Sequence, residues 1–77
     1  MEIKVLGSGC AKCAKTADLI QEVINETGSD ATLEKVTDMM KIASYGVFGT
    51  PSVIIDNEVK CTGKVPKKKE IKAWFAQ

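Results

Sequence analysis

The sequence predicts an α/β domain whose elements follow the order β-α-β-α-β-β-α. Three observations carry this prediction: a short alternating stretch at the N-terminus, a long run with apolar residues at helical spacing, and a second apolar stretch that ends in a two-residue turn. With 77 residues, of which 44% are hydrophobic, the chain is expected to form one domain over residues 1–77. At this size it is near the lower limit for a single apolar core.

The first strand and the first helix are predicted from the change in hydrophobic period. Residues 2–6 alternate between polar and apolar side chains, and residues 7–9 (GSG) are a turn signal. A helix is expected to begin near Cys10 and to end at Gly28. Its buried stripe follows helical spacing and consists of Cys13, Ala17, Ile20, Val23, Ile24 and Thr27.

A second strand and a short helix follow. The strand is expected over residues 31–36, and Asp38 is a suitable N-cap for a helix that extends to about Ser44. The pattern places three side chains of this helix toward the core, namely Met39, Ile42 and Ala43. The first two strands should be parallel, because a helix joins them in a right-handed crossover.

A β-hairpin is predicted next. Residues 52–55 are apolar enough to be buried on both faces of a sheet. Residues 56–57 (DN) both tolerate positive φ and therefore predict a two-residue turn. The returning strand, residues 58–62, would place Val59 and Cys61 on one face.

The last element is expected to be a helix that packs on the sheet. A helix can start at Pro66, and the lysine run at residues 67–69 is interpreted as its solvated beginning. An i, i+3, i+4 stripe then supplies the apolar contacts, and it consists of Ile71, Trp74 and Phe75.

Charge and hydropathy exclude several classes of function. The chain has 11 basic and 10 acidic residues, so its net charge of +1 argues against a nucleic-acid-binding surface. No apolar run approaches the ~20 residues that span a membrane, and the N-terminal stretch lacks the features of a signal peptide. We therefore expect a cytoplasmic monomer that binds neither nucleic acid nor membranes.

The cysteines are the candidate functional residues. The chain has three cysteines and no histidine, which excludes Ser-His-Asp and Cys-His nucleophile systems and mixed Cys/His zinc sites. In a reducing cytosol, the close pair Cys10 and Cys13 is expected to be catalytic or metal-binding rather than a structural disulfide. Cys61 is expected to be a small buried residue of the core.

The position of the pair at the first turn of a helix makes the two thiols unequal. Backbone N–H groups and the helix dipole stabilise a thiolate at Cys10, and Lys12 adds a nearby cation. Cys13, one turn further, is shielded and would resolve a mixed disulfide formed at Cys10. Gly7 and Gly9 are expected to leave room for a partner chain above Cys10. Thiol–disulfide exchange is thus predicted, with a soft-metal carrier for copper or zinc as the alternative.

Two motifs and the closing elements of the chain resemble a known family. The corner at residues 7–13 (GSGCAKC), the segment at residues 49–56 (GTPSVIID) and the closing hairpin and helix are similar to small thioredoxin/glutaredoxin-like redox-active disulfide proteins of archaea and bacteria. The resemblance covers essentially the whole chain and implies a four-stranded mixed sheet flanked by three helices. It implies a cis peptide bond before Pro51. It also implies that Thr50, Pro51 and Gly63 shape the groove in which a client chain pairs as an added strand.

The resemblance further implies the partners of this chain. The implied partners are disulfide-containing client proteins and a flavin-dependent reductase of the thioredoxin-reductase type, and no bound cofactor is needed.

The sequence departs from the family at one buried position. Lys4 stands on the strand where thioredoxins bury an acidic residue, so proton transfer to Cys13 is expected to use another group, such as water. Heavy-metal-associated domains share a similar CxxC loop but end in a strand. Residues 70–75 indicate a helix, which favours the redox function.

Overall fold

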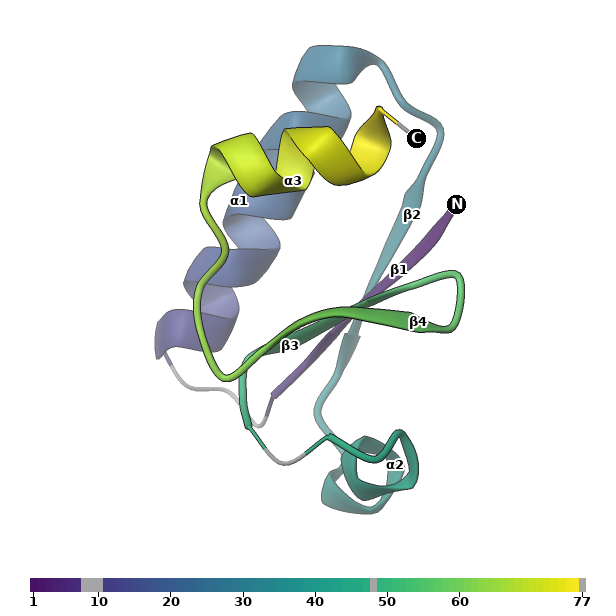
Figure 1. Ribbon diagram of the computed structural model, residues 1–77, viewed down its shortest axis with the longest axis vertical. Helices are drawn as coiled ribbons and strands as arrows, with labels where there is room; N and C mark the ends of the chain where they lie inside the picture. Colours follow the sequence, from purple (N-terminus) through teal and green to yellow (C-terminus); the bar gives the residue numbers. More distant parts are fainter. Residues whose placement is uncertain (8–10, 48, 77) are drawn as a thin grey trace.

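A four-stranded sheet carries helices on both faces (Figure 1). The computed structural model describes residues 1–7, 11–47 and 49–76. Its elements, in chain order, are β1 (Glu2–Leu6), α1 (Ala11–Thr27), β2 (Thr32–Val36), α2 (Met39–Ser44), β3 (Ser52–Ile55), β4 (Glu58–Thr62) and α3 (Lys68–Phe75). The order and the mixed sheet confirm the predicted fold class.

The sheet topology brings distant segments of the chain to one end. The strand order is β2-β1-β3-β4, with β1 parallel to β2 and antiparallel to β3, and with β3 and β4 forming a hairpin. Leu6 at the end of β1 pairs with Ser52 at the start of β3, and Ser52 pairs with Thr62 at the end of β4. The segments that follow β1 and β4 and the segment that precedes β3 therefore meet at the same end of the sheet.

Alternation along the strands builds two apolar clusters. On one face, Ile3 and Val5 of β1 meet the buried side of α1 and Ile71 of α3, with Trp74 and Phe75 packed against the rim. On the other face, Leu6 and Ile54 meet Ile42 of α2. Burying one such side chain contributes about 1.5–3 kcal/mol, so the larger cluster holds the two long helices on the sheet.

The buried side of α1 differs from the predicted stripe at two positions. Thr16 is fully buried, whereas Thr27 at the end of the helix is exposed. Burial of Thr16 is possible because its hydroxyl donates to the Lys12 carbonyl oxygen at 2.8 Å, which satisfies the polar group inside the helix. The helix ends at Thr27, and the φ of +66° at the next residue, Gly28, fits the predicted stop.

Helix α2 is capped as predicted but faces the core differently. The Asp38 carboxylate accepts a hydrogen bond from the Met40 N–H at 2.8 Å. Ile42 is buried, but Met39 is 66% exposed and Ala43 is also exposed, so the prediction for these two residues was wrong. The helix has six residues and reaches the sheet through its last turn, where Tyr45 follows Ile42 in the smaller cluster.

Strand β4 contains an irregularity that the sequence pattern did not indicate. Val53 pairs with Cys61, whereas the next residue, Ile54, pairs with Val59, so one extra residue is inserted in β4 at Lys60. The insertion places Val59 and Cys61 on opposite faces, and the prediction of a shared face was wrong. Cys61 is buried and Val59 is 45% exposed.

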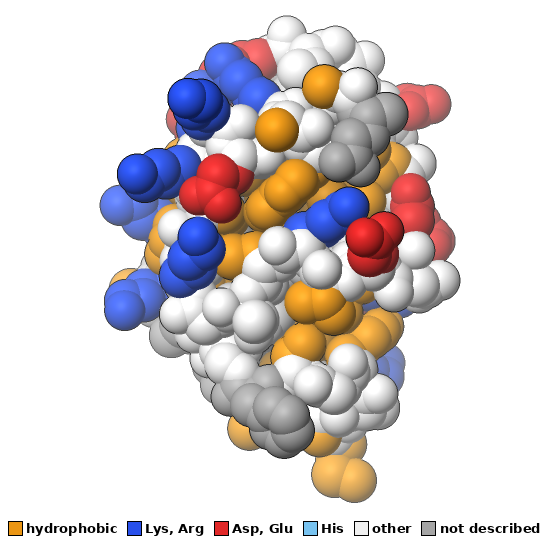
Figure 2. All heavy atoms as spheres, in the orientation of Figure 1, with side chains coloured by type: hydrophobic (Ala, Val, Ile, Leu, Met, Phe, Trp, Pro, Cys, Tyr) orange, Lys and Arg blue, Asp and Glu red, His pale blue; other side chains and the backbone are white. Residues whose placement is uncertain are grey.

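Lys67 and Lys69 at the start of α3 are exposed, as predicted, whereas Lys68 is partly buried. The helix begins at Lys68, two residues after Pro66, and the Glu70 carboxylate accepts from the Lys67 N–H at 3.2 Å. Lys68 forms an ion pair with Glu26 of α1, and Lys72 lies 3.5 Å from the same carboxylate. Figure 2 shows lysine side chains gathered along the edge where α1 and α3 lie. Lys68 and Lys72 of α3 therefore tether this helix to α1. Within the described ranges, no helix is long and apolar enough to cross a membrane.

Candidate functional site

The candidate site lies at the end of the sheet where β1 ends and β3 begins. Cys10 directly precedes the first residue of α1 in the sequence and falls outside the described residues, as do Ser8 and Gly9. Cys13 lies in the first turn of α1 and is 6% exposed, as the stripe predicted. Lys12 is exposed on the same turn.

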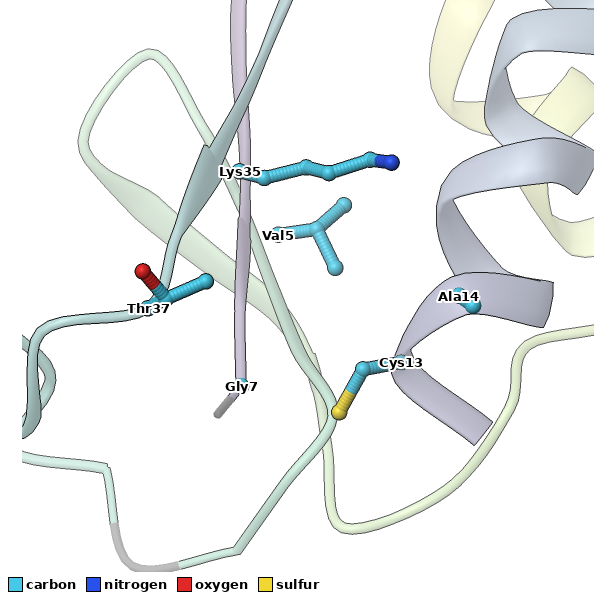
Figure 3. A pocket seen from close by; sticks show the side chains of 6 residues that line it. All are labelled: Val5, Gly7, Cys13, Ala14, Lys35 and Thr37. Atoms are coloured by element: carbon cyan, nitrogen blue, oxygen red, sulfur yellow. The ribbon is translucent and has the colours of Figure 1, made fainter. Parts of the chain in front are cut away.

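Gly7 adjoins Cys13 directly. A Cβ atom built on Gly7 would lie 2.1 Å from the Cys13 Sγ and 3.0 Å from its Cβ, so a side chain at position 7 would occupy the space of the sulfur. Figure 3 shows the Cys13 sulfur directed toward Gly7 at the end of β1. Gly7 is also fixed in place, because its N–H donates to the Val36 carbonyl oxygen at 3.0 Å. The sequence reading assigned this glycine to the approach of a partner chain; the structure shows that it makes room for Cys13.

Thr50 and Pro51 lie at the same end of the sheet as Cys13. The Thr50–Pro51 peptide bond is cis, and Pro51 is buried while Thr50 is exposed. The Thr50 Cβ is 3.8 Å from the position that a Gly7 Cβ would take, so the two segments adjoin. Within the described part of the chain, the backbone N–H and carbonyl of Thr50 make no hydrogen bond. This leaves an exposed, unpaired peptide edge next to the resolving-cysteine candidate.

Gly63 is packed against the loop that holds Pro51. Its N–H donates to the Pro51 carbonyl oxygen at 3.0 Å, and its φ of +76° is one that glycine adopts without strain. Gly49 lies so close that an added Cβ would be 2.9 Å from the Gly63 Cα. Because its N–H is already used in this hydrogen bond, Gly63 can offer a client segment its carbonyl oxygen and its Cα but no hydrogen-bond donor. Nothing in the positions of Gly49 and Gly63 along the sequence indicated that these two residues would be in contact.

A small cleft of about 110 Å³ opens beside Cys13, and sequence reasoning missed two of its lining residues. Lys35 of β2 and Thr37, the residue after β2, line it from the sheet side together with Val5 and Gly7, and Ala14 of α1 lies across from them (Figure 3). Lys35 pairs with Val5 across the parallel strands and shares its face, so the β1–β2 register was the signal that could have found it.

Lys4, which stands on the strand where the family resemblance implies a buried acidic residue, lies on the other face of β1. Its Nζ donates to the Tyr45 hydroxyl at 2.8 Å and lies 5.3 Å from the centre of the ring. The hydrogen bond with Tyr45 raises the pKa of Lys4. Lys4 thus anchors the segment after α2 and does not stand beneath Cys13.

Cys61 is separate from this site. It is 6% exposed, and its Sγ donates to the Lys64 carbonyl oxygen at 3.4 Å. Burial raises the pKa of its thiol, which keeps it protonated and unreactive at neutral pH. Among the residues that the structure describes, no three potential ligands form a group that could hold a metal ion.

Comparison with known proteins places this arrangement in context. The family described as "Thioredoxin domain" matches residues 1–76. A protein named thioredoxin from Methanocaldococcus jannaschii is 41% identical over 70 residues, which cover 91% of this chain and 80% of that protein. A second, also named thioredoxin, from Methanothermobacter thermautotrophicus, is 38% identical over 72 residues, which cover 94% of each chain.

Proposed function

The chain belongs to the thioredoxin family of thiol–disulfide oxidoreductases, and we propose that Cys10 and Cys13 are its redox couple. The observation that carries the proposal is the placement of Cys13. Its sulfur lies against Gly7, 2.1 Å from the position that a Gly7 Cβ would take, and the Cβ of the exposed residue Thr50 lies 3.8 Å from that same position. A resolving thiol and an unpaired backbone edge are thus adjacent, which is what exchange with a bound disulfide segment requires.

The exchange proceeds in two steps. The Cys10 thiolate attacks one sulfur of a client disulfide, so a bond forms between Cys10 and the client and the second client sulfur leaves as a thiolate that takes up a proton. The Cys13 thiolate then attacks the Cys10 sulfur, forming the Cys10–Cys13 disulfide and releasing the first client sulfur. Two electrons pass to the client, which becomes a dithiol, and the protein becomes oxidised.

The positions of the two thiols divide these roles. Cys10 precedes the first residue of α1, where free backbone N–H groups favour a thiolate, and Lys12 adds a cation in the first turn. Such surroundings lower a cysteine pKa from about 8.5 to roughly 3.5–7.5. Cys13 is buried, so it reacts after a mixed disulfide has brought a sulfur within its reach. We therefore assign Cys10 as the nucleophile, Lys12 as the cation that tunes it, and Cys13 as the resolving thiol.

The remaining site residues form the proposed docking surface, which consists of Thr50, Pro51 and Gly63. Thr50 offers its unpaired backbone to an extended client segment, in the way that a peptide adds a strand to a sheet edge. Pro51 and Gly63 hold that edge in place through the hydrogen bond between them. The clients are disulfide-containing proteins, and a flavin-dependent reductase in a reducing cytoplasm returns the couple to the dithiol state.

Substitution of each cysteine tests the roles. Cys10→Ser is expected to abolish reduction of a protein disulfide, because no nucleophile remains. Cys13→Ser is expected to accumulate a covalent mixed disulfide, because the first step proceeds and the second does not. Mass spectrometry of the non-reduced protein identifies the adduct at Cys10. Normal turnover of Cys13→Ser would show that Cys13 is not the resolving thiol.

A redox titration separates electron transfer from metal transport. Thiols are alkylated and counted by mass across a graded series of dithiol buffers, and the metal content of the same sample is measured. A single two-electron transition that consumes the thiols of Cys10 and Cys13 and leaves Cys61 reduced supports the proposal. A pair that stays reduced throughout and carries near-stoichiometric copper or zinc would instead identify a soft-metal carrier.

A further inference from the structure

Two hydroxyl groups connect the segments on which the docking surface is built. The Ser52 Oγ lies 2.5 Å from the Gly49 carbonyl oxygen and 2.9 Å from the Thr62 Oγ1. The Thr62 Oγ1 is itself 3.4 Å from the same Gly49 carbonyl oxygen. We call this arrangement of the Ser52 and Thr62 hydroxyls with the Gly49 carbonyl the hydroxyl latch.

The number of protons decides how the latch is bonded. Each hydroxyl has one proton to donate. Ser52 uses its one proton to donate to the Gly49 carbonyl oxygen. The Ser52 Oγ can then only accept a further hydrogen bond, so the Thr62 hydroxyl donates to it. Ser52 is fully buried, so water does not replace either partner. The latch therefore joins the start of the loop that carries Thr50 to the last residue of β4.

Two backbone contacts complete the connection on the other side of Thr50. The Gly63 N–H donates to the Pro51 carbonyl oxygen at 3.0 Å, and the Gly49 and Gly63 backbones are too close for a side chain on Gly49. Thr50 lies between Gly49, which is linked to Thr62 at the end of β4 through the Ser52 hydroxyl, and Pro51, which accepts the hydrogen bond from Gly63. The exposed peptide edge of Thr50 is consequently held at both ends.

We propose that Ser52 and Thr62 are positioning residues, which hold the Thr50 backbone in the geometry that an extended client segment pairs with. The proposal rests on the proposed function of the docking surface. Neither hydroxyl contacts the reacting sulfur atoms; the latch acts through the Gly49 carbonyl. Its contribution is to order the peptide edge before binding, because a segment that is already ordered loses less conformational entropy on binding a client.

The test uses two disulfides of different size. One is a synthetic peptide with an internal disulfide in an extended segment, which has to pair with Thr50. The other is the aromatic disulfide dye dithiobis(nitrobenzoate), which reaches the reactive thiol without pairing with a peptide edge. KM and kcat are measured for both substrates with the wild type, Ser52→Ala and Thr62→Val, and unfolding transitions are recorded for each variant.

The chain offers matched controls. Ser44 also donates to the carbonyl oxygen three residues earlier, that of Lys41, at 2.6 Å, but it lies exposed at the end of α2. Ser44→Ala therefore removes the same kind of hydrogen bond away from the docking surface. Thr62→Ser keeps the hydroxyl and removes only a methyl group from an exposed residue.

The outcomes separate a positioning role from a general loss of stability. Ser52→Ala and Thr62→Val are each expected to raise KM for the peptide about two- to tenfold, the range that one lost hydrogen bond corresponds to. Peptide kcat and the dye reaction should stay unchanged, and Ser44→Ala and Thr62→Ser should match the wild type. An unchanged peptide KM in Thr62→Val, or an equal loss with peptide and dye, would overturn the proposal. A wild type that reduced neither substrate would overturn the proposed function itself.

Discussion

Replacement of Gly7 by alanine tests the packing of the resolving thiol most directly. The new Cβ would lie 2.1 Å from the Cys13 Sγ, whereas real Cβ atoms essentially never approach another heavy atom within 3.0 Å. The sulfur or the end of β1 must therefore move by about 1 Å, because repulsion rises steeply at such distances. Gly7 has no positive φ, so the effect of the added methyl group is steric and not conformational.

The size of the effect follows from this displacement. Overpacking of a buried site costs about 1–3 kcal/mol of folding free energy, and Gly7 is buried. A reacting atom displaced by about 1 Å can lose roughly 10²-fold in rate. We therefore expect Gly7→Ala to unfold at lower denaturant concentration and to resolve mixed disulfides roughly 10²-fold more slowly, while the attack by Cys10 keeps its rate.

The reaction with dithiobis(nitrobenzoate) measures both steps. The first coloured thiolate is released when Cys10 attacks the dye, and the second when Cys13 resolves the mixed disulfide, so stopped-flow absorbance gives two separate rates. Gly46→Ala is the matched control: Gly46 has a φ of +75°, and nothing lies within 4 Å of an added Cβ. It should lose about 1–2 kcal/mol through the left-handed backbone alone and keep both rates. A wild-type second phase in Gly7→Ala would refute the steric argument.

Two further predictions concern the tethered helices and the third cysteine. Glu26→Gln removes the ion pairs with Lys68 and Lys72; these lysines lower the pKa of Glu26, so the stabilisation is present above the ordinary carboxyl pKa of 4.5 and is lost as the pH falls below it. Urea unfolding at neutral and acidic pH should show a difference between wild type and variant that disappears in acid and in high salt, and a difference that persisted in acid would contradict the assignment. Cys61→Ala should leave the two-electron midpoint potential unchanged, because Cys61 is buried and apart from the site. In the folded wild type, alkylation of Cys61 should become appreciable only at a pH above the usual range for a thiol, since burial raises its pKa; fast alkylation at neutral pH would contradict this.

Local sequence signals determined the order of the elements. The alternation in residues 2–6 and the positive φ angles at Asp56 and Asn57 depend on neighbouring residues alone, and both features formed where the pattern predicted them. The cap at Asp38 is likewise a contact between residues two apart. Such features are readable because the atoms that decide them lie within a few residues of one another in the chain.

Only the tertiary structure decided which side chains meet across the sheet. An extra residue at Lys60 reversed the faces of Val59 and Cys61, and no local pattern announces such an insertion, because it depends on the pairing with β3. The exposure of Met39 likewise depends on where α2 ends relative to the sheet, and not on its helical spacing.

The candidate site divides in the same way. The sequence by itself determined that a cysteine pair begins a helix and that a threonine-proline pair precedes a strand. It did not determine that Gly7 makes room for Cys13, or that Ser52 and Thr62 hold the segment before Pro51. The contacts of Ser52 and Thr62 depend on the register of antiparallel strands, and the contact of Gly7 with Cys13 depends on how α1 packs against the end of β1. The chemical groups were therefore set by the sequence, and their mutual distances by the packing of the sheet.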